Sequence, residues 1–450
     1  MGRIFGTDGA RGIAITELTC EMAMQIGRAA AVVLTKETNH KPQILIGKDT
    51  RISSNILESA LIAGICSVGA DAHILGVVPT PAVAMLVKKY NADAGVMISA
   101  SHNSVEFNGI KLFANTGFKL SDEIEAEIEE LILDKPHEIN LVSGTDVGHI
   151  IYEKDAQWDY VRYIMKTIDG DLSGVKVAID CANGSASETA VKLFRGLGAT
   201  CFFINNTPDG TNINKDCGST HIEGLSKFVV ENKCHVGLAF DGDADRCLAV
   251  DELGEVVDGD KLIAIFAQYM KKTGKLSHNT AVVTIMSNLG FFKFAKENEI
   301  VVATTKVGDR YVLEEMINGG YNLGGEQSGH IIFLDEATTG DGELSGVKLL
   351  HILAHTTIKM SELATIIDTY PQTLVNVRVK PEDKGIWQTD KQVMEAINFC
   401  KNKLGNEGRI LIRESGTEPL IRVMIEGKNY GQVVQYANAI ARVIAERCNK

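Results

Sequence analysis

The hydrophobic and polar positions of the chain repeat one plan three times. In each copy a short apolar run is followed by a polar or glycine-rich turn, a stretch rich in small residues, and a second apolar run. A unit of this kind spans about 30 residues, the size of two parallel strands joined by a helix. The apolar runs are 43–46 and 73–75, 176–179 and 201–204, and 280–284 and 300–303. The repetition predicts three related α/β domains, whose ligands would bind beyond the carboxyl ends of the strands.

The last part of the chain follows a different pattern. Residues 374–379 alternate like a half-exposed strand, and further apolar runs fill 409–413 and 420–425. An amphipathic helix is expected near residues 429–447. This order of elements predicts an α+β domain.

The predicted fold class is therefore α/β, with three related mixed-sheet α/β domains and a C-terminal α+β domain. An acidic helix over residues 121–133, capped by Ser121, and a linker region over 134–150 would close the first domain. The expected domains cover residues 1–150, 151–253, 254–369 and 370–450.

The composition is typical of a soluble globular protein with several cores. The 450 residues are too many for one hydrophobic core, and 45% hydrophobic with 23% charged residues is ordinary. A net charge of −13 without any basic stretch argues against nucleic-acid binding. No run is long enough for a membrane span, and residues 1–6 lack the apolar core of a signal peptide.

The cysteines indicate a reducing compartment. There are nine, an odd number, and no two of them form a CxxC pair. This pattern argues against a disulfide framework and against a zinc site. We therefore expect a cytoplasmic protein that binds neither nucleic acid nor membrane.

Residues 241–246 read Asp-Gly-Asp-Ala-Asp-Arg and are the most informative stretch of the chain. Alternate side chains of an extended segment point to the same side, so Asp241, Asp243 and Asp245 can converge on one point. Three like charges this close repel one another unless a cation lies between them, and carboxylate oxygens favour a hard ion such as Mg²⁺. With Arg246 beside them, the aspartates predict a magnesium site that also meets phosphate.

Two other readings of this stretch are weaker. A surface acidic loop is the first, but strand-like apolar runs at 236–240 and 247–250 enclose the aspartates. A calcium-binding loop is the second, because the three aspartates and Glu252 fill four of its ligand positions. However, Arg246 stands where that loop requires glycine, and the flanking runs are strands rather than helices.

Two further polar loops follow strand-like runs. Residues 97–104 read Met-Ile-Ser-Ala-Ser-His-Asn-Ser, and Asn-Gly-Ile-Lys follows at 108–111. Small residues at the end of a strand let a ligand approach the backbone, although an ordinary polar turn has the same composition. Residues 323–330 place a glutamate, a serine and a histidine on one side of a glycine-flanked segment. A carboxylate with a hydroxyl suits paired sugar hydroxyls, and a bend with a solvated glutamate is the alternative.

A third loop, residues 413–419, reads Arg-Glu-Ser-Gly-Thr-Glu-Pro. It offers successive backbone N–H groups and two hydroxyls, with one arginine at its start and Arg422 after it. Such a loop suits a phosphate group, although a plain hairpin turn remains possible. Residues 5–12, which include Arg11, and residues 307–310 are ambiguous on their own.

Taken together, the loops resemble those of the α-D-phosphohexomutase family. In the family's order, the chain carries FGTDGARG, GKDTR, ISASHN, NGIK, DGDADR, VGDR, GGEQSGH and RESGTEP, so the resemblance covers essentially the whole chain. Residues 208–214, 217–221 and 286–290, with Gln327, are closest to the branch that acts on glucosamine phosphates. Eight loops in register are far more specific than any single one.

The resemblance implies a phosphoserine at Ser101, whose phosphoryl group passes to and from the sugar. One Mg²⁺ per chain would be held by Asp241, Asp243, Asp245 and the phosphate on Ser101. Arg246 would help to neutralise the transferring group, because phosphoryl transfer depends mainly on positioning and charge stabilisation.

The resemblance also assigns groups around the sugar. The candidates for proton transfer near the reacting hydroxyl are Arg11, His102, Lys111 and His330. The residues that would border or clamp the sugar are Asp309, Arg310, Glu326 and Ser328. The residues that would grip the phosphate that does not react are Arg413, Ser415, Gly416, Thr417 and Arg422. One position departs from the family pattern, since Ser104 stands where proline is usual.

The activity implied by the resemblance is the interconversion of glucosamine 6-phosphate and glucosamine 1-phosphate. It would proceed through glucosamine 1,6-bisphosphate in a central cleft, to which the four domains bring the phosphoserine, metal, sugar and phosphate loops in that order. The product would feed UDP-N-acetylglucosamine synthesis, and homodimers are common in the family. The alternatives are a phosphoglucomutase/phosphomannomutase, a metal-dependent sugar phosphatase and a non-catalytic sugar-phosphate sensor.

Overall fold

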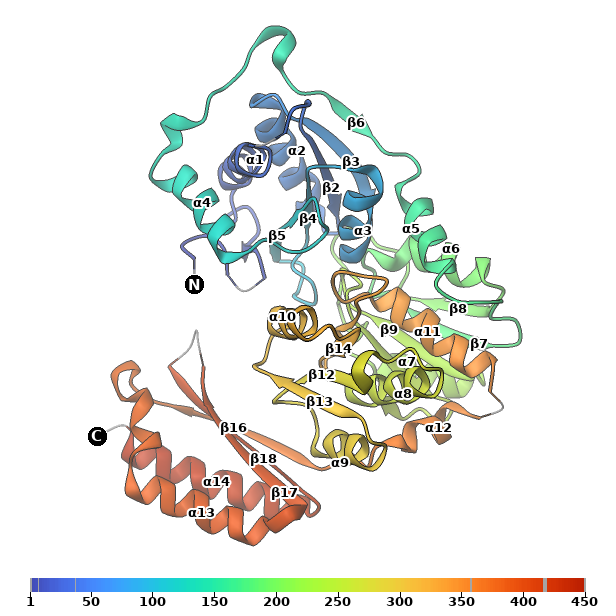
Figure 1. Cartoon of the computed structure of the whole chain (residues 1–450), viewed down its shortest axis with the longest axis vertical. Coiled ribbons are helices and arrows are strands. Elements are labelled where there is room, and N and C mark those ends of the chain that lie inside the picture. Colours follow the sequence, from blue (N-terminus) through green and yellow to red (C-terminus); the bar gives the residue numbers. More distant parts are fainter. Residues whose placement is uncertain (1, 7, 37, 357, 416–418, 449–450) are drawn as a thin grey trace. The chain divides into compact units, whose positions relative to one another are not determined.

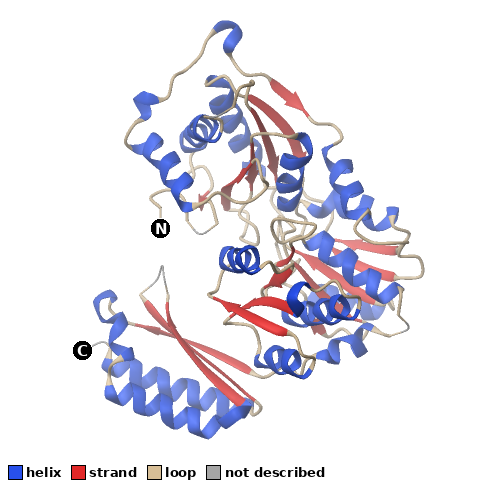
Figure 2. Cartoon of the chain, viewed as in Figure 1, coloured by secondary structure: helices blue, strands red, loops and turns tan. Residues whose placement is uncertain are grey.

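The computed structural model describes residues 2–6, 8–36, 38–356, 358–415 and 419–448. The chain divides into two compact units. One consists of residues 1–286 and 299–366, and the other of residues 287–298 and 367–450. The first unit holds three β-sheets with their helices, and the second holds a fourth sheet (Figures 1 and 2).

The first sheet contains six strands. They are β1 (Ala10–Ile13), β2 (Gln43–Lys48), β3 (Asp71–Val77), β4 (Ala94–Ile98), β5 (Phe107–Ala114) and β6 (Ile150–Tyr152), in the order β1-β5-β4-β2-β3-β6. β4, β2, β3 and β6 are parallel, and β5 is antiparallel to β4 and β1. The helices of this part are α1 (Cys20–Leu34), α2 (Ile52–Ser67), α3 (Thr80–Tyr90), α4 (Asp122–Leu133), η1 (Pro136–Glu138) and η2 (Gly144–Asp146).

Two details differ from the sequence prediction. Ser121 is the N-cap residue of α4, but its side chain accepts no hydrogen bond from the first turn of the helix. The region 134–150, predicted as a linker, leads directly into β6, which pairs with β3 as the last strand of the sheet. An exposed three-residue edge strand is too short to give an alternating pattern in the sequence.

The second sheet contains five strands. They are β7 (Lys176–Asp180), β8 (Thr200–Ile204), β9 (Val236–Phe240), β10 (Cys247–Asp251) and β11 (Val256–Val257), in the order β11-β10-β9-β7-β8. β9, β7 and β8 are parallel, and β10 is antiparallel to both of its neighbours. The helices are α5 (Ala156–Met165), α6 (Ala186–Gly196) and α7 (Glu223–Glu231).

The third sheet contains four strands. They are β12 (Thr280–Thr284), β13 (Val301–Thr305), β14 (Leu323–Gly325) and β15 (Ile331–Phe333), in the order β13-β12-β14-β15. β15 alone is antiparallel to its neighbour. The helices are α8 (Gly259–Lys272), α10 (Asp309–Gly319), α11 (Gly342–Ala354), α12 (Met360–Leu363), η3 (Ser277–Asn279) and η4 (Ala364–Ile366).

The three sheets share one pattern of connections. In each sheet a strand lies between two parallel neighbours, and one of those neighbours continues through a loop into an antiparallel strand. The corresponding rows are β3-β2-β4-β5, β8-β7-β9-β10 and β13-β12-β14-β15. The predicted α/β repeat is therefore confirmed, and it extends beyond the predicted unit to include this hairpin.

The second unit has the predicted α+β arrangement. Its strands β16 (Gln372–Arg378), β17 (Gly408–Glu414) and β18 (Leu420–Gly427) form an antiparallel sheet in the order β16-β18-β17. Its helices are α9 (Leu289–Glu297), α13 (Lys391–Leu404), α14 (Tyr430–Arg447), η5 (Pro381–Gln388) and η6 (Gly405–Glu407). Residues of α13 and α14 pack with β16 and β18 in one buried cluster, which gives this unit its own core.

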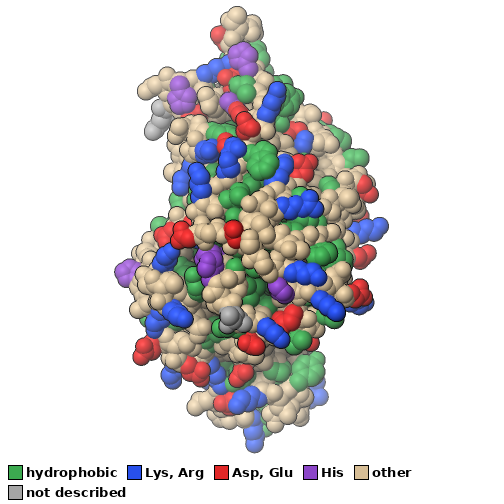
Figure 3. Space-filling model, turned by 90° about the vertical axis from the view of Figure 1, so that its right-hand side faces the viewer, with side chains coloured by type: hydrophobic (Ala, Val, Ile, Leu, Met, Phe, Trp, Pro, Cys, Tyr) green, Lys and Arg blue, Asp and Glu red, His purple; other side chains and the backbone are tan. Residues whose placement is uncertain are grey.

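Charged side chains of both signs are interspersed over the face drawn in Figure 3, with small groups of hydrophobic side chains between them. In the part of the chain that the structure describes, no helix combines the length and the apolar character needed to cross a bilayer.

Helices α1 and α2 approach each other through two glycines. A Cβ atom on Gly64 of α2 would overlap the carbonyl oxygen of Met24 in α1. A Cβ atom on Gly27 of α1 would lie 2.8 Å from the carbonyl oxygen of Leu61 in α2. The helix backbones are therefore in contact, and a side chain at either glycine would force them apart.

Replacing Gly64 by valine is expected to destabilise the protein by about 1–3 kcal/mol, because the added atoms overpack a core. The matched control is Gly224→Ala in α7, where a Cβ atom would meet nothing within 4 Å. This control should stabilise slightly, by about 0.5–1 kcal/mol, since alanine favours a helix over glycine. The measurement is the midpoint of urea unfolding, and equal midpoints for the two variants would contradict the packing argument.

Candidate active site

Three loops that carry the predicted chemistry occupy equivalent positions in the three repeated sheets. Residues 99–106 join β4 to β5, residues 241–246 join β9 to β10, and residues 326–330 join β14 to β15. Each loop leaves the carboxyl end of a strand that belongs to the parallel part of its sheet. Ligands of open α/β sheets bind at such ends, so the fold itself presents three loops for chemistry.

Ser101 contacts the aspartate loop. Its Oγ donates a hydrogen bond of 2.7 Å to Oδ2 of Asp241 and lies 3.3 Å from Nδ1 of His102. The residue is 2% exposed, and its backbone has a left-handed φ of 53°. Such a φ is uncommon outside glycine and is often found at functional turns. The loop therefore directs a buried hydroxyl at a carboxylate from another sheet.

A buried polar network fixes the backbone of Ser101. Its carbonyl oxygen accepts hydrogen bonds from Nδ2 of Asn214 (2.8 Å) and from the guanidinium of Arg51 (3.3 Å). Arg51 forms a fully buried ion pair with Asp49. Asp49 also accepts the hydroxyl of Ser99 (2.6 Å), whose Oγ accepts the N–H of Ser101 (3.0 Å). The serine is held at both its N–H and its carbonyl group.

The three aspartates are buried and converge as predicted. Asp241, Asp243 and Asp245 each offer one oxygen, and these oxygens lie within 4.8 Å of one another. Among the described residues, Oδ1 of Asp243 and Oδ1 of Asp245 have no hydrogen-bond partner although both are buried. A buried carboxylate oxygen without a partner is costly, so these atoms fit a hard cation. Oxygen ligands of this kind suit hard cations such as Mg²⁺ and Ca²⁺.

The cations of the protein balance these carboxylates only in part. Nζ of Lys111 lies 2.8 Å from Oδ2 of Asp243 and 3.6 Å from Oδ2 of Asp245. Burial, Asp245 and Asp243 raise the pKa of Asp241 to about 8. Burial also disfavours the charge of Asp245, but Lys111 and His330 outweigh it and hold the pKa of Asp245 well below its usual range. One carboxyl group with a raised pKa beside another with a lowered pKa indicates a cluster that lacks positive charge.

The first and second sheets meet closely at this point. Thr80, the first residue of α3, donates its N–H to the carbonyl oxygen of Asp243 (2.9 Å) and its hydroxyl to Oδ2 of the same residue (2.6 Å). A Cβ atom on Gly242 would lie 2.6 Å from the carbonyl oxygen of Ser101. Glycine at this position is what lets the aspartate loop come so close to the serine loop.

His330 extends the cluster into the third sheet. Its Nε2 accepts the N–H of Gly340 (3.1 Å), and its Nδ1 lies 3.6 Å from Oδ2 of Asp245. Its Nε2 also lies 3.8 Å from Oδ2 of Asp309. Burial lowers the pKa of His330, but Asp245 and Asp309 outweigh burial and raise it. The carboxylates of two sheets therefore act on the same imidazole.

Lys119 bridges the first and third sheets. Its Nζ donates hydrogen bonds of 2.6 Å to Oδ1 of Asp8 and 2.6 Å to Oδ2 of Asp309. A pocket of about 190 Å³ lies beside this bridge. Its lining includes four predicted site residues, Lys111, Asp309, Arg310 and His330.

Two arginines lie near His102. Arg11 forms an ion pair with Asp8, and Nε of Arg246 lies 3.9 Å from Oδ1 of Asp245. Burial, Arg246 and Arg11 lower the pKa of His102 to about 4. At neutral pH this imidazole is therefore uncharged.

The residues predicted to bind the sugar make fewer buried polar contacts than the residues around the aspartate cluster. Oε1 of Glu326 accepts the N–H of Gly308 (3.1 Å), and Arg310 pairs with Asp122. The hydroxyl of Ser328 is buried and has no hydrogen-bond partner in the described part of the chain. The Ser328 hydroxyl is therefore available to a polar ligand such as a sugar.

The predicted phosphate loop lies in the second unit, between β17 and β18. Arg413 and Arg422 are direct cross-strand neighbours in the antiparallel register. Burial and Arg422 lower the pKa of Arg413, as expected for two guanidinium groups side by side. Such a pair is suited to an anion. The backbone N–H of Ser415 donates to the carbonyl oxygen of Leu420 (2.9 Å). The predicted residues Gly416 and Thr417 lie outside the described residues.

Several residues that hold the site were not assigned from the sequence. Asp49, Arg51 and Asn214 lie in stretches that carry the family resemblance, so a signal for them existed. Thr80 and Lys119 had none, because their partners lie 163 and 190 positions away in the chain. Only the folded structure brings them together.

Models of one family match the chain from its first residues to its last helix. Three are described as alpha/beta/alpha domains I, II and III of phosphoglucomutase/phosphomannomutase, and the fourth as the C-terminal domain. The matches cover residues 2–138, 159–254, 258–370 and 374–443. The chain belongs to the phosphoglucomutase/phosphomannomutase family. As a member of this family the protein is a mutase, an isomerase, and the resemblance seen in the sequence is confirmed.

Curated relatives in the phosphoglucomutase/phosphomannomutase family are similar over their whole length. A protein of Acetivibrio thermocellus named phosphoglucosamine mutase is 56% identical over 447 residues, covering 99% of this chain and 100% of its own. A protein of Clostridium perfringens with the same name is 54% identical over 449 residues, and the match covers both chains completely.

Solved structures of the family share the fold at lower identity. A Burkholderia thailandensis family protein has a TM-score of 0.83 at 23% identity, covering 98% of this chain and 97% of its own. An Aspergillus fumigatus N-acetylphosphoglucosamine mutase, solved with GlcNAc-6P and magnesium, has a TM-score of 0.70 at 17% identity, covering 100% and 96%.

Replacing Asn214 by alanine is expected to lower kcat by roughly tenfold to a hundredfold, because a shift of the Ser101 backbone misplaces the hydroxyl. Asn212→Ala is the matched control, since the side chain of Asn212 bonds within its own loop, to Asp209 and Thr207. Mutase turnover of both variants should be compared at equal folded protein. An unchanged kcat in Asn214→Ala would show that the carbonyl hydrogen bond does not position the serine.

Proposed function

We propose that the protein interconverts glucosamine 6-phosphate and glucosamine 1-phosphate. One observation carries the proposal: the hydroxyl of Ser101 donates to Asp241, a member of the buried aspartate cluster. A nucleophile and a metal site in contact are what phosphoryl transfer to and from a serine requires. The choice of glucosamine is supported by the two full-length relatives named phosphoglucosamine mutase.

The donor set suits one Mg²⁺ per chain. Asp241, Asp243 and Asp245 would hold it together with an oxygen of a phosphate carried by Ser101. When bound, the ion would neutralise charge on the phosphoryl group during transfer. The partnerless Oδ1 atoms of Asp243 and Asp245 support this assignment.

The proposed cycle transfers one phosphoryl group in each direction. The phosphoryl group of phosphorylated Ser101 passes to O1 of glucosamine 6-phosphate, so the bond to Oγ breaks and the bond to O1 forms. The product, glucosamine 1,6-bisphosphate, turns end for end and returns its 6-phosphoryl group to Oγ. The proton of the attacking sugar hydroxyl leaves to a nearby base in the first step, and O6 takes up a proton in the second.

The pKa values support different roles for the candidate proton-transfer groups. Burial opposes the charge of Lys111, but Asp243 and Asp8 outweigh burial and raise the pKa of Lys111 further above its usual value. A permanent ammonium stabilises negative charge rather than accepting a proton. His102, whose pKa is lowered to about 4, is uncharged at neutral pH and only weakly basic. We therefore propose Lys111 as an electrostatic group, with His102, His330 and Arg11 as the candidates for proton transfer.

The remaining assignments rest on the family pattern. Glu326 and Ser328 would bind sugar hydroxyls, and Asp309 and Arg310 would border the substrate. The non-reacting phosphate would be gripped by Arg413, Ser415, Gly416, Thr417 and Arg422. We also propose the four domains 1–150, 151–253, 254–369 and 370–450, a cytoplasmic location and a homodimer. The product would enter UDP-N-acetylglucosamine synthesis.

Replacing Ser101 by alanine is expected to reduce mutase turnover at least about a thousandfold, because no other group can carry the phosphoryl group. Ser104→Ala is the matched control, since Ser104 lies in the same loop but is exposed. The assay follows conversion of glucosamine 6-phosphate with Mg²⁺ and a trace of glucosamine 1,6-bisphosphate. Substantial mutase turnover by Ser101→Ala would contradict the proposal. Net release of phosphate by the unmodified protein would instead favour a phosphatase.

Removing the metal or one of its ligands tests the aspartate cluster. EDTA is expected to abolish turnover, and Mg²⁺ should restore it. Asp243→Asn should raise the Mg²⁺ concentration for half-maximal activity by at least about a hundredfold, a loss typical of a damaged metal site. Asp216→Asn, at an exposed position whose left-handed φ suits asparagine, should leave it unchanged. Equal Mg²⁺ requirements in the two variants would place the metal elsewhere.

A further inference from the structure

A closed ring of acidic and basic side chains joins the three α/β domains. In order around the ring, its members are Asp8, Lys111, Asp245, His330, Asp309 and Lys119. Acids and bases alternate, and each side chain lies 2.6 to 3.8 Å from the next. Domain I supplies three members, domain II one and domain III two. Every carboxylate of the ring therefore has a basic side chain on either side, which offsets the cost of removing it from water.

The ring is held most tightly at Lys119. Its ammonium group donates hydrogen bonds of 2.6 Å to Asp8 in domain I and of 2.6 Å to Asp309 in domain III. The other four contacts of the ring are longer, from 3.4 to 3.8 Å. Lys119 also lies on the opposite side of the ring from Asp245, the member that belongs to the aspartate cluster. Lys119 therefore closes the ring without contacting that cluster itself.

The two partners of Lys119 contact groups of the active site. Asp8 contacts two basic residues of domain I, and Asp309 lies beside the imidazole of the sugar loop. These neighbours are three of the residues predicted for proton transfer, Arg11, Lys111 and His330. Among the described residues, the ion pairs of Lys119 are those with Asp8 and Asp309. Any effect of Lys119 on chemistry would therefore pass through these two carboxylates.

We propose that Lys119 is a positioning residue for the mutase reaction. By holding Asp8 and Asp309 together, it sets the separation of two loops that belong to different domains. The distances of the predicted proton-transfer groups from the aspartate cluster then depend on this one ammonium group. A displacement of about 1 Å in an active site can lower a rate about a hundredfold. The proposal rests on the mutase activity of the proposed function, but not on the choice of glucosamine as the sugar.

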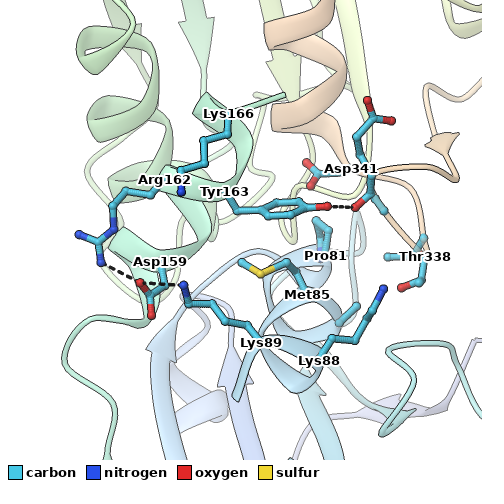
Figure 4. Close-up of a pocket in the computed structure, with 14 residues that line it drawn as sticks. Pro81, Met85, Lys88, Lys89, Asp159, Arg162, Tyr163, Lys166, Thr338 and Asp341 are labelled. Carbon is cyan, nitrogen blue, oxygen red and sulfur yellow. Dashed lines mark hydrogen bonds and ion pairs between the residues drawn. The ribbon is translucent and has the colours of Figure 1, made fainter. Parts of the chain in front are cut away.

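Lys348 offers a matched control. Its side chain is 19% exposed, against 20% for Lys119. Its ammonium group also bridges two domains, with bonds of 2.8 Å to the carbonyl oxygen of Thr167 and 2.8 Å to Glu336. Glu336 lines a pocket of about 360 Å³ between α3, α5 and residues 336–341, which Figure 4 shows. Of the described residues that line this pocket, none is a predicted site residue. The two lysines therefore match in burial and in bonds, and differ in what their partners contact.

Replacing Lys119 by methionine is expected to lower kcat about tenfold to a hundredfold at equal folded protein, because Asp8 and Asp309 lose the cation that they share. Lys348→Met should leave kcat within about twofold of the unmodified protein. The Mg²⁺ concentration for half-maximal activity should stay within about threefold in both variants, since neither lysine contacts a predicted metal ligand. Equal kcat values in the two variants would contradict the proposal. A Mg²⁺ requirement that rises as expected for Asp243→Asn would also contradict it, because the loss would then arise at the metal site.

A second comparison separates the charge of Lys119 from its volume. In Lys119→Arg the guanidinium group keeps the charge and can donate to both carboxylates, so kcat should exceed that of Lys119→Met at least about fivefold. Lys119→Gln keeps a donor without the charge, and it serves as the uncharged variant if Lys119→Met does not fold. Equal kcat values in the arginine and glutamine variants would contradict the proposal.

This test and the test of the proposed function can fail separately. An unmodified protein that does not convert glucosamine 6-phosphate would contradict the proposed function alone. The same variants of Lys119 would then be compared with glucose 6-phosphate as the substrate, and the same order of kcat values is expected.

Discussion

Three carboxylates buried within 4.8 Å of one another are the constraint on which the rest of the site depends. Like charges at this distance in a buried place destabilise one another strongly unless positive charge lies among them. Three basic side chains lie beside the carboxylates: Lys111 from the first sheet, Arg246 from the same loop, and His330 from the third sheet. None of these groups donates a hydrogen bond to Oδ1 of Asp243 or Oδ1 of Asp245, so both atoms can still bind a cation. Ser101 lies at the edge of this site, because its hydroxyl donates to Asp241.

The repeated sheet explains how these groups come together. The three chemical loops are one structural element, the hairpin after a parallel strand, used three times with different residues. One copy carries Ser101, the next carries the three aspartates, and the third carries the predicted sugar loop and His330. Each copy has its own core, such as the cluster under β2, β3 and β4, so a loop can change without disturbing the others. The different residues of the three loops therefore meet because the same connectivity is repeated in the three sheets.

Much of the fold and the centre of the site could be predicted from the sequence. The strands of the repeat carry continuous apolar runs, and the spacing of Asp241, Asp243 and Asp245 already implies convergence. β6 and the role of Thr80 could not be predicted, since a short exposed edge strand and a hydrogen bond across 163 residues leave no local pattern. Lys119 is the clearest case. No motif in the sequence surrounds it, yet in the fold its ammonium group lies between the carboxylates of Asp8 and Asp309, which belong to different domains. Such pairings depend on how the domains dock, and the hydrophobic periodicity of the sequence does not predict docking.

The placement of the aspartate loop against a different sheet has a consequence for how the molecule assembles. Neither α/β domain encloses the carboxylate cluster by itself, because Ser101, Thr80 and Lys111 come from one domain and the aspartates from the next. The desolvation cost of these charges therefore falls on the contact between the two domains rather than on the core of either one. A cation bound at this contact would add its binding free energy to the docking of the two domains. A cation held by the three aspartates would therefore stabilise the contact between the two domains as well as the carboxylates themselves.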